Sequence, residues 1–218
     1  MGNLILSGGG SFQQNLEVYK FLGTIIEKDK PVLYIPLAGD PNHRPYTESL
    51  DYIKSIFKPL GIKEVLMWTD LNQRTLGELK SFSAVYFSGG STLTLLNAIK
   101  NSGFEKTLIE YFKDGGTIFG QSAGAIIFGS DVSHTTPEKR VEDYQPLNFI
   151  HNKGLWCHYE NSDDKLLCEI SKQYSIPLIA LSDGAAIHVT ETNCHVIAKE
   201  AFEFRDGRKT PFEFMANE

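Results

Sequence analysis

The chain has 218 residues, 41% of them hydrophobic, and its 21 basic and 27 acidic side chains give a formal net charge of −6. This length and composition predict one globular domain over residues 1–218, and the acidic balance without a Lys/Arg cluster excludes nucleic acid and anionic membranes as expected partners. No apolar run approaches the roughly 20 residues that span a bilayer, and the N-terminal residues lack a secretory signal. We therefore expect a cytoplasmic protein, and the spacing of Cys157, Cys168 and Cys194 predicts reduced thiols.

The first 130 residues alternate short apolar runs with longer amphipathic segments, which is typical of a parallel sheet covered by helices. Runs rich in β-branched and aromatic residues predict strands at 4–6, 31–36, 64–68, 84–87 and 117–119. Apolar residues at helical spacing predict helices at 13–27, 45–57, 75–79, 93–100 and 104–112. Glycine and proline mark the loops between them.

The second part of the chain has a different pattern. After a polar stretch, the apolar run 155–157 precedes a predicted helix at 163–174. Four short runs, at 178–181, 185–190, 194–198 and 201–204, are separated by turn signals and predict antiparallel strands. The fold class is therefore α/β, with an antiparallel C-terminal edge.

The motif Gly120-Gln121-Ser122-Ala123-Gly124 has the G-x-S-x-G form of a nucleophile elbow. It follows an apolar strand and opens a short apolar helix, which is the context that this form requires. Glycine at both ends permits a strained, closely packed turn, and Ser122 would lie exposed at the carboxyl end of the sheet. The alternative is a tight turn in which the serine only caps the helix.

A serine nucleophile also needs two hydrogen-bond donors for the oxyanion of the tetrahedral intermediate. The backbone N–H of Ala123 is one candidate, because it lies at a helix N-terminus. Ser88-Gly89-Gly90-Ser91-Thr92 closes the neighbouring strand, so Gly89 or Gly90 is the natural second donor. These glycines fit a plain turn equally well, and for Gly8-Gly9-Gly10 the turn is the favoured interpretation.

The serine needs a base, and His158 is the best placed of six histidines because it ends the apolar run 155–157, where packing would fix the imidazole. Two carboxylates are candidates for the group that orients it. Asp183 ends the run 178–181, and Glu160 follows His158 by two residues, so it would share a face on a strand. The other histidines lie in loops or in the C-terminal strands: His43, His134, His151, His188 and His195.

Taken in chain order, the elbow at 120–124, the upstream Ser88-Gly89-Gly90, His158 and Ser182-Asp183-Gly184 resemble one family of serine peptidases. It is the family that contains peptidase E, an aspartyl dipeptidase, and the cyanophycinases. The similarity runs the length of the chain. The resemblance implies a flavodoxin-like three-layer fold, of the type found in class I glutamine amidotransferases, with a central mostly parallel sheet.

Carried over by position, the resemblance implies Ser122 as nucleophile, His158 as general base and acid, and Gly90 with Ala123 as oxyanion hole. The matching acid is Asp183, where the family usually has glutamate. An acid shortly after the nucleophile, near Glu138, is an alternative. Ser91 also departs from the family, which commonly has asparagine in its G-G-N-T pattern. Chain order argues against an α/β-hydrolase, which places its acid before its histidine.

We therefore expect a serine peptidase that cleaves short peptides through an acyl-enzyme, with no cofactor and no metal. The resemblance implies a dipeptidase or exopeptidase that prefers an N-terminal aspartate, and such an enzyme needs a basic pocket. Two alternatives stay open: a cyanophycinase-like hydrolase, and a non-catalytic flavodoxin-like module that binds a ligand. The expected partner is a small peptide, and a homo-oligomer is left open. The sequence does not rank the cations of the pocket, for which the candidates are Arg44, Lys139, Arg140, Lys165 and Arg205.

Overall fold

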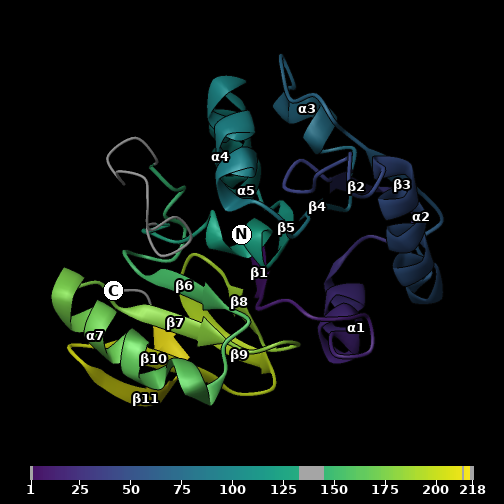
Figure 1. Cartoon of the computed structure of the whole chain (residues 1–218). Helices are drawn as coiled ribbons and strands as arrows, with labels where there is room; N and C mark the ends of the chain where they lie inside the picture. Colours follow the sequence, from purple (N-terminus) through teal and green to yellow (C-terminus); the bar gives the residue numbers. More distant parts are fainter. Residues whose placement is uncertain (1, 133–144, 213, 217–218) are drawn as a thin grey trace.

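The structure is a computed structural model that describes residues 2–132 and 145–212 and the backbone of 214–216 (Figure 1). Eight of the described strands form a central sheet. Its order is β12 (Phe214–Ala216), β9 (Asn193–Ala198), β8 (Ala186–Val189), β1 (Asn3–Ser7), β5 (Thr117–Gln121), β4 (Ala84–Phe87), β2 (Val32–Ile35) and β3 (Val65–Met67). The five strands from β1 to β3 are parallel, and β8, β9 and β12 are antiparallel to their neighbours. The predicted α/β fold, with a mostly parallel sheet and an antiparallel C-terminal edge, is confirmed.

A second, smaller sheet lies beside the central one (Figure 1). Its order is β11 (Arg208–Phe212), β10 (Ala201–Arg205), β7 (Leu178–Leu181) and β6 (Gly154–Cys157). The sequence pattern places β7 in the antiparallel series, but β7 runs parallel to β6 and pairs antiparallel with β10. The reason is that β7 is fully buried on both faces: Ile179 and Leu181 join the main core, whereas Leu178 and Ala180 join a separate small core.

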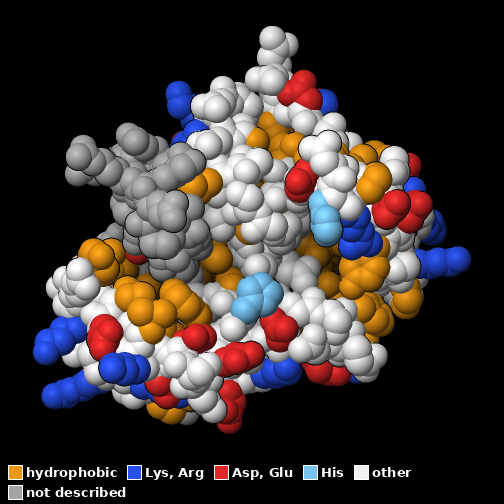
Figure 2. All heavy atoms as spheres, in the orientation of Figure 1, with side chains coloured by type: hydrophobic (Ala, Val, Ile, Leu, Met, Phe, Trp, Pro, Cys, Tyr) orange, Lys and Arg blue, Asp and Glu red, His pale blue; other side chains and the backbone are white. Residues whose placement is uncertain are grey.

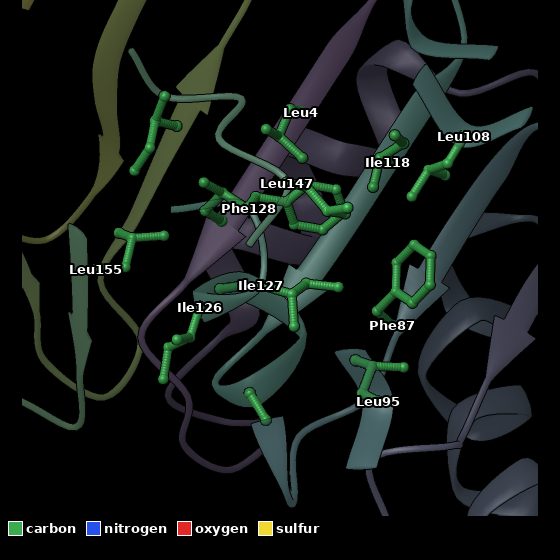
Figure 3. Packing of buried hydrophobic residues seen from close by; sticks show 14 of the residues in the cluster. Leu4, Phe87, Leu95, Leu108, Ile118, Ile126, Ile127, Phe128, Leu147 and Leu155 are labelled. Carbon is green, nitrogen blue, oxygen red and sulfur yellow. The ribbon is translucent and has the colours of Figure 1, made fainter. Parts of the chain in front are cut away.

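Helices cover both faces of the central sheet, as the three-layer fold requires. Adjacent residues of β1 point to opposite faces, so Ile5 packs with α1 (Leu16–Ile25) and α2 (Tyr46–Phe57), whereas Leu4 and Leu6 face the other layer. Figure 3 shows that second layer, where Leu4 and Ile118 pack against Leu95 and Phe128. Its helices are α4 (Thr92–Asn101), α5 (Phe104–Lys113) and α6 (Ala123–Ile126), with α3 (Leu76–Leu79) nearby.

The remaining helical segments belong to the periphery. Helix α7 (Asp164–Tyr174) packs on the second sheet, against β10 and β11, and a 3₁₀ turn (Asn161–Asp163) leads into it. Another 3₁₀ turn (Lys58–Leu60) extends α2. Among the residues that the structure describes, no helix has both the length and the apolar character needed to cross a bilayer. The arrangement brings the carboxyl ends of β1, β5 and β4, which are neighbours in the sheet, to one edge.

Candidate active site

The motif at 120–124 forms a tight turn between β5 and α6. Ser122 has φ +52° and ψ −116°, a strained conformation for a residue with a side chain. A Cβ on Gly120 would lie 2.2 Å from the carbonyl oxygen of Gly124, and a Cβ on Gly124 would lie 2.4 Å from that of Phe87. Both positions therefore require glycine, and the strand–turn–helix arrangement that the motif predicts is present.

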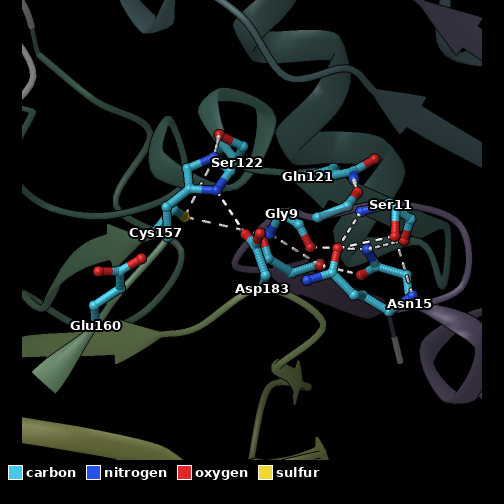
Figure 4. Close-up of polar contacts among 12 residues, drawn as sticks. Gly9, Ser11, Asn15, Gln121, Ser122, Cys157, Glu160 and Asp183 are labelled. Carbon is cyan, nitrogen blue, oxygen red and sulfur yellow. Dashed lines mark hydrogen bonds and ion pairs between the residues drawn. The ribbon is translucent and has the colours of Figure 1, made fainter.

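His158 and Asp183 reach Ser122 from the second sheet. The two residues follow β6 and β7, which are parallel neighbours with Cys157 opposite Leu181, so their side chains emerge together. The Ser122 Oγ is 2.7 Å from the His158 Nε2, and the His158 Nδ1 is 2.7 Å from the Asp183 Oδ1 (Figure 4). The structure thus joins the predicted serine, histidine and aspartate in one chain of contacts.

The other two candidate carboxylates differ from Asp183 in their surroundings. Glu160 lies apart from Ser122 and Asp183 (Figure 4), and its side chain accepts the backbone N–H of Asp163. The alternation of a strand ends before it, because β6 stops at Cys157 and His158 has φ +56°. Residues 158 and 160 therefore do not share a strand face. Glu138 lies outside the residues that the structure describes.

The two predicted oxyanion donors belong to segments next to Ser122. Ala123 is the first residue of α6, so its N–H has no acceptor within the helix. The loop after β4 contacts the serine: a Cβ on Gly89 would lie 3.3 Å from the Ser122 Cβ. Gly90 has φ +138°, and a Cβ there would be 2.1 Å from the Ala38 carbonyl oxygen, so glycine is required. Ser91, at the position where the resemblance commonly implies asparagine, caps α4 by accepting the Thr94 N–H.

A cavity of about 460 Å³ opens beside Ser122 and His158. On the face that Figure 2 shows, the middle of the molecule is hollowed and the Lys and Arg side chains gather mostly toward the periphery. Arg44 nevertheless lines the cavity, with its guanidinium carbon 5.3 Å from the centre of the Tyr52 ring. Sequence reasoning named Arg44 but missed the four tyrosines of the lining, which are Tyr34, Tyr46, Tyr52 and Tyr86.

The family profile described as "Peptidase family S51" matches residues 4–197. The chain belongs to peptidase family S51. It is 26% identical over 201 residues to the uncharacterized peptidase YgaJ of Bacillus subtilis, covering 86% of this chain and 83% of that one. It is 23% identical over 186 residues to the peptidase E of Haemophilus influenzae, covering 80% and 84%.

The fold of this S51 peptidase also has a solved counterpart. The crystal structure of a peptidase from an acI-B1 Actinobacterium matches with a TM-score of 0.73 and 19% identity, covering 100% of this chain and 97% of the other. At this identity the likeness supports the fold alone. The family match establishes the protein as a serine-type peptidase hydrolase, which was the sequence-based expectation.

Two titratable groups beside Ser122 are held neutral in this S51 peptidase. Cys157 is buried, and its Sγ lies 3.7 Å from the Ser122 carbonyl oxygen. Burial, with the charge of Asp183, raises the pKa of this thiol far above its ordinary value, so Cys157 does not compete as a nucleophile. Burial likewise raises the pKa of Tyr86 well above 10, and its hydroxyl donates to the Gln121 Oε1. Among the described residues, no group of three or more His, Cys, Asp or Glu side chains could hold a metal.

Proposed function

We propose that the protein hydrolyses short peptides through an acyl-enzyme formed on Ser122. The observation that carries the proposal is the pair of 2.7 Å contacts that joins Ser122 to His158 and His158 to Asp183. A serine is a poor nucleophile until a base accepts its proton, and the His158 Nε2 lies within hydrogen-bond distance of the Oγ. The strained backbone of Ser122 supports a functional role over a turn that merely caps a helix.

In the first half-reaction the Ser122 Oγ attacks the peptide carbonyl carbon while His158 accepts the hydroxyl proton at Nε2. The tetrahedral intermediate collapses, the C–N bond breaks, and His158 donates that proton to the departing amine. In the second half-reaction His158 removes a proton from water, and the hydroxide displaces Ser122 to release the carboxylate product. The Ser122 oxygen recovers its proton from His158, so no cofactor enters the cycle.

Asp183 and two backbone N–H groups would support these steps. Asp183 accepts the Nδ1–H of His158, which leaves Nε2 free to accept the serine proton and stabilises the imidazolium that forms. Ala123 and Gly90 would donate to the oxyanion, because the first lies at a helix N-terminus and the second in a loop packed beside the serine.

We further propose that the substrate is a dipeptide or a short peptide whose N-terminal residue has an acidic side chain. Three of the five candidate cations lie in the part of the chain that the structure describes. Of these, Arg44 lines the cavity, whereas Lys165 and Arg205 do not. Lys139 and Arg140 lie outside the described residues. Asp40 also lines the cavity, so the lining has a cation that could pair with an acidic side chain and an anion that could pair with a free α-ammonium.

The experiment is a dipeptide panel: Asp-Leu, Asn-Leu and Leu-Leu, with products resolved by chromatography. We expect Asp-Leu to be cleaved with the highest kcat/KM. The substitution Arg44→Met should raise KM for Asp-Leu by up to about fivefold, because a partly exposed charge pair contributes at most about 1 kcal/mol. Lys165→Met on α7 is the matched control and should leave KM unchanged. Equal cleavage of Asp-Leu and Asn-Leu, or an unchanged KM in Arg44→Met, would contradict the acidic preference.

The other expectations stay predictions. A cyanophycinase-like activity uses the same chemistry, and the β-aspartyl-arginine polymer in the same assay distinguishes it from dipeptide cleavage. A non-catalytic binding module would turn over neither substrate. The cytoplasmic location is likewise a prediction of the sequence, which leaves the oligomeric state open.

A further inference from the structure

The end of β1 contacts the backbone of all three site segments. The carbonyl oxygens of residues 7, 8 and 9 accept, in that order, the N–H groups of Ser122, His158 and Gly184, each at 2.9 Å. Gly184 directly follows Asp183. Three consecutive peptide groups of one short segment therefore set where the serine, the histidine and the aspartate lie relative to one another.

The two glycines of this segment allow the close approach. A Cβ on Gly8 would lie 2.3 Å from the Leu181 carbonyl oxygen, and a Cβ on Gly9 would lie 2.2 Å from the His158 Cε1. Gly9 has φ +115°, and Gly10 has φ +97°. The backbone of consecutive glycines has many accessible conformations, so this segment needs contacts that hold it in one of them.

One buried side chain supplies those contacts. Asn15 is fully buried, and its Nδ2 donates to the carbonyl oxygens of Gly9, at 2.8 Å, and Ser11, at 3.0 Å. Its Oδ1 accepts the hydroxyl of Ser7 at 2.7 Å, and that hydroxyl in turn accepts the Gly9 N–H at 3.3 Å (Figure 4). The Gly9 carbonyl thus receives both Asn15 and Gly184, which couples the buried amide to the site.

Gln121 fixes the same segment from the cavity side. Its Nε2 donates to the Gly10 carbonyl oxygen at 2.9 Å, and its Oε1 accepts the hydroxyl of Tyr86. Gln121 contacts the cavity and the residue next to the nucleophile, so its effects on positioning and on substrate binding overlap. Asn15 is buried behind the loop and does not line the cavity, so its contribution is separable.

We propose that Asn15 is a positioning residue, which fixes the segment of residues 7–10 and through it the relative placement of Ser122, His158 and Asp183. The inference rests on the proposed function for its kinetic test but not for its spectroscopic test. A displacement of reacting groups by about 1 Å costs on the order of 10²-fold in rate. Loss of the Asn15 amide should therefore lower kcat and leave KM close to that of the parent, because the cavity lining is unchanged.

The test uses Asn15→Leu, which keeps the approximate shape and removes the amide, and two readouts. Turnover of the best dipeptide should fall 10- to 100-fold in kcat with KM within about twofold. The proton shared by His158 and Asp183 should give a low-field ¹H NMR signal in the parent, and that signal should shift or broaden in Asn15→Leu. The signal does not depend on peptidase activity, so failure of the proposed function would be seen separately, as a parent that holds the signal but cleaves nothing.

Two further variants make the outcome decisive. Ser83→Ala is the control. It removes a buried hydroxyl that donates to the Pro31 carbonyl oxygen at the opposite end of the sheet, and it should change neither kcat nor the signal. If Asn15→Leu fails to fold, Ser7→Ala decides, because it removes the hydroxyl shared by Asn15 and Gly9 and should lower kcat several-fold with the same spectral change. A folded Asn15→Leu, or in its absence a folded Ser7→Ala, that keeps the parent kcat and the parent signal would overturn the proposal.

Discussion

The contact between Gly9 and the His158 ring gives a sharp test of the site geometry. The substitution Gly9→Ala would place a Cβ 2.2 Å from the His158 Cε1, whereas ordinary van der Waals contact begins at 3.4 Å. The ring must therefore withdraw by the difference, about 1.2 Å, and a side-chain ring yields more easily than the backbone carbonyls around Gly8. The withdrawal lengthens both 2.7 Å contacts of the imidazole.

A displacement of this size should reduce kcat by about 10²-fold while the fold is kept. The positive φ of residue 9 adds backbone strain on the order of 1–3 kcal/mol, which also lowers stability. Gly103→Ala is the matched control, because Gly103 has φ +71° and open space around the site of the new Cβ. It should share the loss of stability and keep the parent kcat.

The assay combines steady-state kinetics on the best dipeptide with urea unfolding of parent, Gly9→Ala and Gly103→Ala. Stability loss in both variants with a kcat loss confined to Gly9→Ala is the expected pattern. A folded Gly9→Ala with the parent kcat would refute the reasoning that the loop sets the position of the imidazole. Equal kcat losses in both variants would mean that general destabilisation, and not displacement of the imidazole, lowers kcat in Gly9→Ala.

Two other predictions follow from the site and from a buried histidine. Asp183→Ala should lower kcat by about 10⁴-fold with circular dichroism unchanged, whereas Glu160→Ala should stay near the parent rate, and the reverse order would reassign the acid. Burial, with the charge of His195, lowers the pKa of His188 from 6.5 to about 4, so the unfolded chain binds more protons between these values. The free energy of unfolding should therefore fall as pH drops from 6.5 towards 4, by up to about 1.4 kcal/mol per pH unit from this group. Urea unfolding at several pH values should show that this free energy depends less steeply on pH in His188→Gln than in the parent. An identical pH dependence in the two proteins would contradict a lowered pKa of His188.

The parts of the site that lie in one local motif were predictable from the sequence. The turn at Ser122 is dictated by glycine at 120 and 124, and strand ends in a parallel sheet meet at one edge, so Ser122 and the loop at Gly90 could be brought together in advance. The sequence singles out His158 and Asp183 as candidates because each lies at the end of an apolar run. Chain order then separated this arrangement from an α/β-hydrolase.

Other parts depend on long-range packing that no local pattern encodes. The run 178–181 has the composition of a buried strand, but its pairing with β6 and β10 depends on which core each face meets. The choice between Asp183 and Glu160 depends on the left-handed backbone of His158, which ends the strand alternation. The sequence favours a plain turn for the glycines at 8–10, because the close approach of Gly9 to His158 joins residues about 150 positions apart in the sequence.

The central claim is that Ser122 is the nucleophile of an acyl-enzyme, and a fluorophosphonate probe tests it most directly. Intact-mass measurement and peptide mapping of the treated parent should show one adduct, located on Ser122. The adduct should be absent from Ser122→Ala and should form orders of magnitude more slowly in His158→Ala. A parent that stays unlabelled at high probe concentration, or a Ser122→Ala variant labelled like the parent, would contradict the assignment of Ser122.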